Sequence, residues 1–184
     1  HDKGWHPTAV LGTLAATAAA ASLHGLDAQT TRHALSLAAS NSSGVLANFG
    51  SMVKPMHAGK SAAAALQAVA YARAGITAGD DAIGAHDGLL AALSTQGRVD
   101  LTAQTRLGER WFSVSTPLVF KKYPVCFSAH RAIEAVLRLS GEHAVVPSEI
   151  ETIEGSVRGT QARVLRFEAV GHMGCAVAGV GLSL

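Results

Sequence analysis

Residues 6–24 read HPTAVLGTLAATAAAASLH, and this stretch decides the fold. Its proline fits the first turn of a helix, where the missing N–H costs nothing. Alanine has the highest helix propensity of any residue, and Gly25 is suited to end the helix because glycine readily adopts left-handed backbone geometry. The stretch therefore predicts a helix over 7–24, whose small side chains allow neighbouring helices to approach closely.

Further helices are predicted on both sides of several glycine and proline breaks. Asp27 is a good N-cap for a second helix, which would form a helical hairpin with the first. Residues 45–55 are expected to be a loop or short helix, and Gly141 is expected to end the last long helix. The remaining expected helices cover 28–39, 61–73, 89–93 and 128–139.

The pattern changes in the second half of the chain. Residues 114–123 mix β-branched and aromatic side chains, which favours a strand or extended linker, and residues 150–157 alternate as a strand does. We therefore place a domain boundary near residue 115, with 1–115 as part of an all-α domain and 116–184 as part of an α+β domain. The predicted fold class is mainly α, an Ala-rich helical domain followed by the start of a smaller α+β domain.

Composition excludes several classes of protein. Hydrophobic residues make up 48% and charged residues 15% of the 184, with a net charge of +2, so neither a disordered chain nor a strongly basic nucleic-acid binder is indicated. Residues 4–26 carry no charged side chain, yet their Ala, Thr, Gly and Ser give little drive for membrane insertion, and we expect no membrane contact. Cys126 and Cys175 form no CxxC pair, which suits a reducing compartment, although one disulfide stays open.

Two clusters before helices contain candidate functional residues. His6 lies at a helix N-terminus, where the neutral imidazole is favoured and suits a proton acceptor; a capping or core histidine is the alternative. Lys54 and His57 precede the third predicted helix, whose N–H groups favour an anion, and Gly59 would permit close approach of a ligand. An ordinary surface loop is the alternative there.

Two more clusters occur later in the chain. KKYPVC at 121–126 also leads into a predicted helix, and Cys126 is either a nucleophile or, as we favour, a small buried residue. His86 and Asp87 are either an orienting pair or an ordinary polar turn. The nine histidines show no HExxH or paired Cys/His spacing, and no Walker, GxGxxG or GxSxG motif occurs, so we predict no metal and no cofactor.

Taken in order, these motifs resemble the MmgE/PrpD family, which includes 2-methylcitrate dehydratases, cis-aconitate decarboxylases and iminodisuccinate epimerases. The resemblance covers about residues 1–140. It rests on GWHPT at 4–8, GLD at 25–27, KPMHAG at 54–59 and KKYPVCFSAH at 121–130. Residues 169–184 carry no charge, are rich in glycine and resemble nothing in the family.

The resemblance implies a helical domain and a smaller α+β lid domain with the site between them, a small di- or tricarboxylic acid as substrate, no metal and a homodimer. The cysteine usage leads us to expect a cytoplasmic location. Such substrates need cations for their carboxylates and an acid or base at carbon. Matched by motif, the catalytic residues would be His6, Lys54 and Lys121, with His57, Gly59, Tyr123 and His130 binding substrate.

The expected function is therefore that of a fragment of a metal-independent, 2-methylcitrate dehydratase-like lyase. The alternatives are a cis-aconitate decarboxylase-like or iminodisuccinate epimerase-like enzyme and, in another class, a truncated non-catalytic homolog or helical interaction module. In the family the helical domain begins well before the GWHPT motif, and that earlier part carries further active-site residues. We therefore expect this chain to be incomplete as an enzyme.

Overall fold

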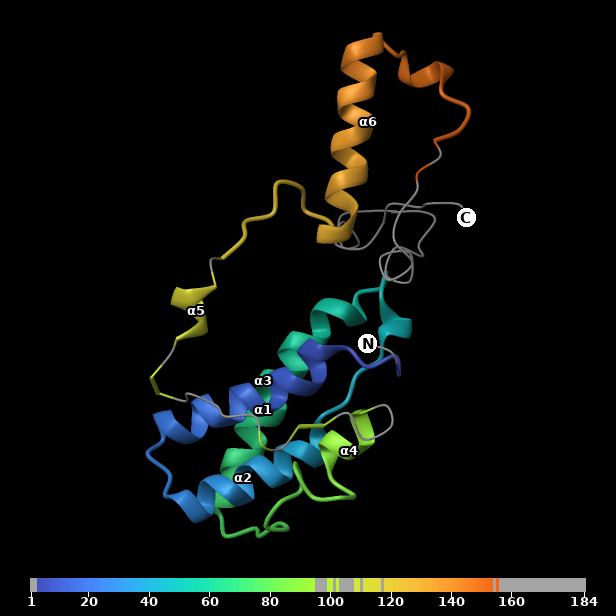
Figure 1. Cartoon of the computed structure of the whole chain (residues 1–184). Helices are drawn as coiled ribbons and strands as arrows, with labels where there is room; N and C mark the ends of the chain where they lie inside the picture. The colour runs from blue at the N-terminus through green and yellow to red at the C-terminus, as the bar shows by residue number, and fades with distance from the viewer. Residues whose placement is uncertain are drawn as a thin grey trace. The chain divides into compact units, whose positions relative to one another are not determined.

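The computed structural model describes residues 3–94, 99–100, 102, 108–109, 111–116, 118–153 and 155 (Figure 1). The chain divides into two units: His1–Asn48 with Val53–Thr105, and Phe49–Met52 with Arg106–Leu184. The fold is mainly α, as predicted. Within the described residues, β-structure is limited to one antiparallel bridge between Trp5 and Val45. The domain boundary near residue 115 stays a prediction.

Three helices packed side by side build the first unit (Figure 1): α1 (Pro7–Leu23), α2 (Ala28–Asn41) and α3 (Val53–Arg73). The first predicted helix is confirmed to within one residue, and the second extends two residues further than expected. Asp27 caps α2 as predicted, its carboxylate accepting the Thr30 N–H at 2.8 Å. This bond, with a second to the Thr30 hydroxyl, lowers the pKa of Asp27.

Small side chains form the core between these helices. Ala21, Ala34, Val69 and Ala72 make one buried cluster. The hydroxyl of Thr13, buried on α1, donates to the Ala9 carbonyl at 2.8 Å, so its burial leaves no polar group unsatisfied. Closely packed helix backbones thus form this core in place of large apolar side chains, as the alanine content indicates. No described helix combines the length and apolar character needed to cross a membrane.

The third helix begins earlier than predicted. It starts at Val53 rather than Ser61, so the KPMHAG motif occupies its first two turns and is not a preceding loop. Pro55 lies in the first turn, where backbone N–H groups have no partner within the helix. The proline is therefore compatible with the first turn of α3, and the predicted start of this helix at Ser61 was wrong.

Shorter elements complete the first unit. A 3₁₀ turn, Leu46–Asn48, lies in the connection from α2 to α3, and α4 (Leu89–Leu93) has the predicted bounds. His33 on α2 accepts the Ala78 N–H at 3.2 Å. This bond holds the segment after α3 against α2. The expected polar turn is present, with Asp81 accepting the Gly84 N–H at 2.6 Å.

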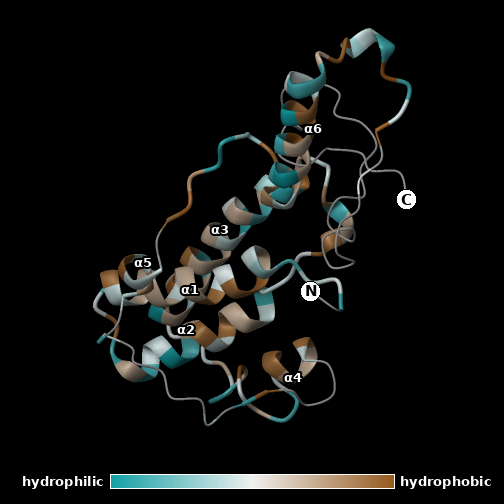
Figure 2. Cartoon of the chain, turned by 45° about the horizontal axis from the view of Figure 1, so that its top comes forward, coloured by the Kyte–Doolittle hydropathy of each residue, from teal (hydrophilic) through white to brown (hydrophobic). Residues whose placement is uncertain are grey.

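The second unit contains short elements and one long helix: α5 (Phe112–Ser115), η2 (Phe127–Ala129), α6 (His130–His143) and η3 (Pro147–Glu149). Polar and apolar residues follow one another along α6 (Figure 2). Gly141 does not end α6, since a glycine is tolerated inside a helix at about 1 kcal/mol relative to alanine. The helix ends instead at His143, and the next residue, Ala144, adopts a left-handed backbone with φ 49°.

The two segments expected to be extended have different outcomes. Of residues 114–123, Val114 and Ser115 belong to α5, whereas Thr116 and residues 118–123 form neither helix nor strand, which fits the linker alternative. Residues 150–153 form no strand, so an alternating pattern alone is not sufficient to predict one. The remainder of that predicted strand, apart from residue 155, and the unusual stretch 169–184 lie outside the described residues.

Candidate functional site

His6 and His57 meet across the contact between α1 and α3. His6 is the residue immediately before α1, and His57 lies in the second turn of α3. Their Nδ1 atoms are 2.8 Å apart, and their ring centroids are 5.1 Å apart at an interplanar angle of 47°. Both side chains are buried, with 8% and 3% of each residue exposed. Two histidines distant in sequence therefore form one hydrogen-bonded pair.

The geometry of this pair restricts its protons. A bond between two Nδ1 atoms needs one ring to donate and the other to accept, so the accepting ring, when neutral, carries its proton on Nε2. Burial lowers the pKa of His6 below its usual value, and the positive charges available to His57 and Lys54 lower it further. His6 is thus held in the neutral form that can accept a proton.

Backbone contacts fix the histidine pair from the side of the α2–α3 connection. The N–H of His6 donates to the carbonyl of Gly44 at 2.9 Å, and the N–H of Leu46 donates to the carbonyl of Gly4 at 2.7 Å. These two bonds flank the antiparallel bridge between Trp5 and Val45. The GWHPT motif is therefore held by a segment almost forty residues later in the chain.

The remaining residues of the KPMHAG motif have different surroundings. Lys54 is partly buried in the first turn of α3, close enough to affect the pKa of His6. Gly59 is exposed, with open space around its Cα, and its role as a ligand contact stays a prediction. The next residue, Lys60, donates to the carbonyl of Ser43 at 3.1 Å and also to its hydroxyl. Lys60 thus supports the connection between α2 and α3.

The predicted residues of the second unit form a separate cluster. His130 begins α6, and its Nε2 is 3.1 Å from the carbonyl oxygen of Tyr123. The two rings pack edge to face, with centroids 5.3 Å apart. The ring of Phe127 also packs against His130, with centroids 5.0 Å apart. Lys121 is exposed, and its predicted catalytic role is untested.

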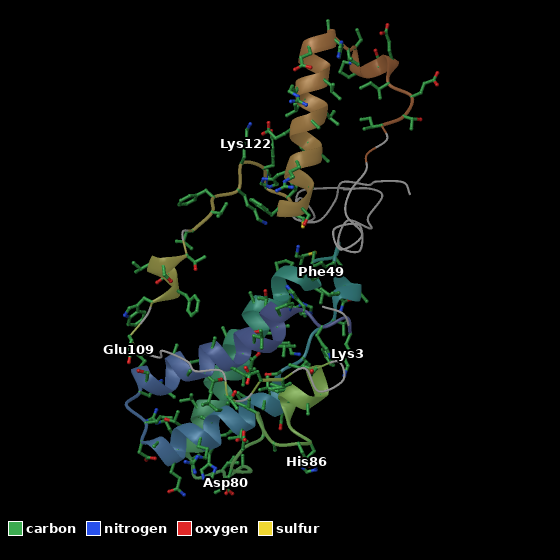
Figure 3. The ribbon with its side chains drawn as sticks, in the orientation of Figure 1. Lys3, Phe49, Asp80, His86, Glu109 and Lys122 are labelled. Atoms are coloured by element: carbon green, nitrogen blue, oxygen red, sulfur yellow. The ribbon has the colours of Figure 1, made fainter. Side chains whose placement is uncertain are left out.

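Lys122, rather than Lys121, forms an ion pair in this cluster (Figure 3). It contacts the carboxylate of Glu134, which also accepts the hydroxyl of Tyr123 at 2.7 Å. The bond to Glu134 raises the pKa of Lys122 and that of Tyr123, and the two donors lower the pKa of Glu134. Lys122 and Glu134 are well exposed to solvent and Tyr123 is partly buried, so the ion pair orders the surface more than it stabilises the fold.

Seven sequence-predicted residues are thus distributed over two units. The structure brings His6, Lys54 and His57 together in the first unit, and it brings Tyr123 and His130 together in the second. Their assembly into one site stays a prediction. Sequence reasoning missed Gly44 and Ser61; Ser61, four residues after His57 on the same helix face, was the clearer signal.

Other groups behave as ordinary structure. His86 and Asp87 lie on the turn before α4 with side chains 93% and 78% exposed, as expected of a polar turn (Figure 3). A hollow of about 410 Å³ along α2, lined in part by Arg32, Ser36 and Asp80, includes none of the seven residues. Among the residues with described positions, no three His, Cys, Asp or Glu side chains are grouped to hold a metal ion. Cys126 is partly buried, and Cys175 lies outside the described residues.

Comparison with known proteins agrees with the motifs and their placement on α1 and α3. The model of the MmgE/PrpD N-terminal domain matches residues 1–102, more than half of the chain, and the chain therefore belongs to this family. It is similar to the cis-aconitate decarboxylase of Homo sapiens, at 27% identity over 80% of this chain and 31% of that protein. The cis-aconitate decarboxylase of Mus musculus is 28% identical over 79% of this chain and 29% of that protein. The chain thus spans about a third of the length of these relatives.

Proposed function

We propose that this chain is part of a lyase that acts on small di- or tricarboxylic acids by acid–base chemistry, with cis-aconitate as the first substrate to test. The observation that carries the proposal is the buried His6–His57 pair, 2.8 Å between Nδ1 atoms, beside the cation Lys54. The two cis-aconitate decarboxylases support the choice of substrate. Dehydration of 2-methylcitrate, the first expectation from sequence, is the second reaction to test.

Each member of this group has a role that suits a polycarboxylate. Lys54 would neutralise one carboxylate and stabilise the negative charge that develops on the substrate. In decarboxylation, the C–C bond to one carboxylate breaks, carbon dioxide leaves, and the electron pair remaining on carbon takes up a proton. A histidine with a lowered pKa is a stronger acid once protonated, so protonated His6 can deliver that proton.

The same residues can serve a dehydration. There, neutral His6 accepts a proton from carbon, and the electron pair moves to form the double bond as hydroxide leaves with a proton from an acid. His57 would pass or hold the proton through the Nδ1–Nδ1 contact. The two reactions use one pair in opposite protonation states, so the pH profile of the rate distinguishes them.

The experiment is a direct assay of the 184-residue chain with cis-aconitate and 2-methylcitrate, in which ¹H NMR follows the product. We expect His6→Gln to lower kcat by about 100-fold or more, the usual contribution of a positioned acid or base. His86→Gln, an exposed histidine in the same unit, is the matched control and should leave kcat unchanged. Equal rates for His6→Gln and the control would refute the role of His6.

Absence of turnover with either acid would favour the alternative of a non-catalytic homolog. Titration of the chain with cis-aconitate by calorimetry then decides whether a carboxylate site exists. Heat of binding that Lys54→Met abolishes and His86→Gln preserves would support a binding site without the complete machinery for catalysis. No heat at millimolar ligand would refute the proposed substrate class for this chain.

A further inference from the structure

We infer that Gly44 is a positioning residue for the histidine pair: because it lacks a side chain, the α2–α3 connection lies directly against the edge of the His57 imidazole and holds that ring on His6. Gly44 touches no substrate in this role and acts through His57. The consequence for catalysis rests on the proposed function, whereas the effect on the two imidazoles does not.

The space around Gly44 leaves no room for a methyl group. A Cβ placed on Gly44 would lie 2.4 Å from the Cβ of Ala9, and 3.1 Å and 3.3 Å from Nε2 and Cδ2 of His57. Contacts below about 3.5 Å between carbon atoms are repulsive. Ala9 and His57 are both buried, at 1% and 3% exposed, so neither side chain has free space into which it can move.

The backbone at Gly44 is also fastened on both sides. Its carbonyl accepts the N–H of His6, and the preceding carbonyl, of Ser43, accepts from Lys60. Lys60 lies on α3, three residues after His57. The segment is thus tied to α1 and to α3, and it cannot retreat from an added methyl group without breaking one of these bonds. Strain from that group must pass to Ala9 on α1 or to the His57 ring.

Displacement of the ring changes the chemistry of the pair. The Nδ1–Nδ1 contact is 2.8 Å long, and a shift of about 1 Å takes it beyond hydrogen-bond range. His6 would then lose the partner that fixes its tautomer. Neither Gly4 nor Gly59, the glycines of the GWHPT and KPMHAG motifs, has His6 or His57 within 4 Å of its Cβ position, which makes Gly44 the specific candidate.

The test compares Gly44→Ala with the double variant Ala9→Gly/Gly44→Ala. The double variant removes the 2.4 Å clash with Ala9 and leaves two effects, the contact with His57 and the strain of an L residue at the φ of +158° that Gly44 adopts. Adding His57→Ala to it separates these effects, because that change relieves only the contact with the ring. Ala9→Gly alone gives the cost of the new glycine in α1. Gly12→Ala is the control for a glycine-to-alanine change in the same unit, because its Cβ would meet Ser61 only at ordinary distances of 3.7 Å and 3.8 Å.

The readout is the side-chain nitrogen NMR spectrum of the ¹⁵N-labelled chain across pH. In the wild type, Ala9→Gly and Gly12→Ala, we expect one protonated and one unprotonated Nδ1 and a His6 that titrates below pH 6.5. In the double variant we expect the two rings to lose this complementary pattern and His6 to titrate closer to its ordinary pH. An unchanged pattern and titration in the folded double variant would overturn the inference.

Two additional measurements cover the remaining outcomes. If the double variant does not fold, His57→Ala is added to it; regained stability would locate the residual clash on the imidazole and support the inference, and no gain would contradict it. If the chain proves active, the double variant should lower kcat at least tenfold with little change in KM. An altered NMR pattern in a chain that turns over neither acid would uphold Gly44 while refuting the proposed reaction.

Discussion

The hydroxyl of Ser61 lies 3.0 Å from the carbonyl oxygen of Thr8, and this contact joins the helix that carries His57 to the helix that follows His6. The same hydroxyl is 2.9 Å from the carbonyl of His57 and 3.3 Å from that of Ala9. A single buried side chain thus lies one turn from the histidine pair and contacts both helices that position it.

Removing this hydroxyl should loosen the two helices. We expect Ser61→Ala to lower the free energy of unfolding by about 1 kcal/mol, the usual net value of an intramolecular hydrogen bond, because the Thr8 carbonyl loses a donor. Urea denaturation followed by circular dichroism measures it. Ser22→Ala, exposed on α1, is the control and should lie within about 0.5 kcal/mol of wild type. Equal stability of the two variants would contradict a role for Ser61 in joining the helices.

The lowered pKa of His6 predicts a pH dependence of stability. Because burial holds the folded-state pKa below the usual value of about 6.5, the unfolded chain binds a proton between these two values that the folded chain does not. The contribution of His6 is therefore full above pH 6.5, falls as the pH drops toward the folded pKa, and levels off below it. The slope from this one residue is at most about 1.4 kcal/mol per pH unit.

Denaturation curves between pH 5 and 8 test this sign. His6→Gln should flatten the dependence of the unfolding free energy on pH below 6.5, and His86→Gln, an exposed histidine, should leave the wild-type slope unchanged. A His6→Gln chain that keeps the full slope would show that other groups produce it.

Lys54 should act on His6 at a distance through its charge. It contributes to the lowered pKa of His6, after burial and His57. We expect Lys54→Met to raise the pH at which His6 titrates, measured by NMR of its ring protons. Lys3→Met, which removes an exposed cation that bonds the Ala92 carbonyl, is the control and should have no such effect. A downward shift in Lys54→Met would reverse the assigned sign.

The alanine core predicts intolerance of larger side chains. Ala68 on α3 is fully buried, and we expect Ala68→Leu to lower the free energy of unfolding by about 1–3 kcal/mol because the closely packed helices must move apart. Ala70→Leu is the matched control at an exposed position of the same helix. Thermal denaturation compares them, and an Ala68→Leu chain as stable as its control would mean that the interface can adapt.

The exposed cluster at the start of α6 gives a spectroscopic prediction. The bond to the Glu134 carboxylate is the main cause that raises the pKa of Tyr123, so Glu134→Gln should lower that pKa. Ultraviolet titration in a Tyr71→Phe background reports Tyr123 alone, since the chain has two tyrosines. Glu142→Gln, whose carboxylate lies near Arg138, is the control. No downward shift would indicate that the bond between Tyr123 and Glu134 is absent in solution.

Local signals in the sequence predicted the first unit well and its site only partly. Proline at 7, Asp27 and the glycine at 25 act within a few residues, and the helices they predict are present. The start of α3 was predicted at Ser61 rather than Val53, because a proline such as Pro55 fits a loop as well as the first turn of a helix. The contact between His6 and Gly44 depends on how the helices pack, which no local pattern encodes.

The second unit was harder to predict for a related reason. Residues 150–153 alternate, but a strand requires a neighbouring strand that local sequence does not reveal. The four motifs identified the family, yet which lysine of the 121–122 pair meets Glu134 depends on the rotation of the chain before α6. Family membership could be predicted from ordered motifs, whereas the partners of individual side chains could not.

Small residues let α1 and α3 approach closely, and the distance between these two helices determines whether His6 and His57 are in contact. The hydrogen bond between His6 and His57 persists only while the two helices keep their separation, and an increase of about 1 Å would break it without unfolding either helix. Mild heating, or a cavity introduced elsewhere in the core, would then break the contact between the two imidazoles. Circular dichroism would still show the native helix content. In this protein, loss of the contact between the two imidazoles should precede loss of helical structure.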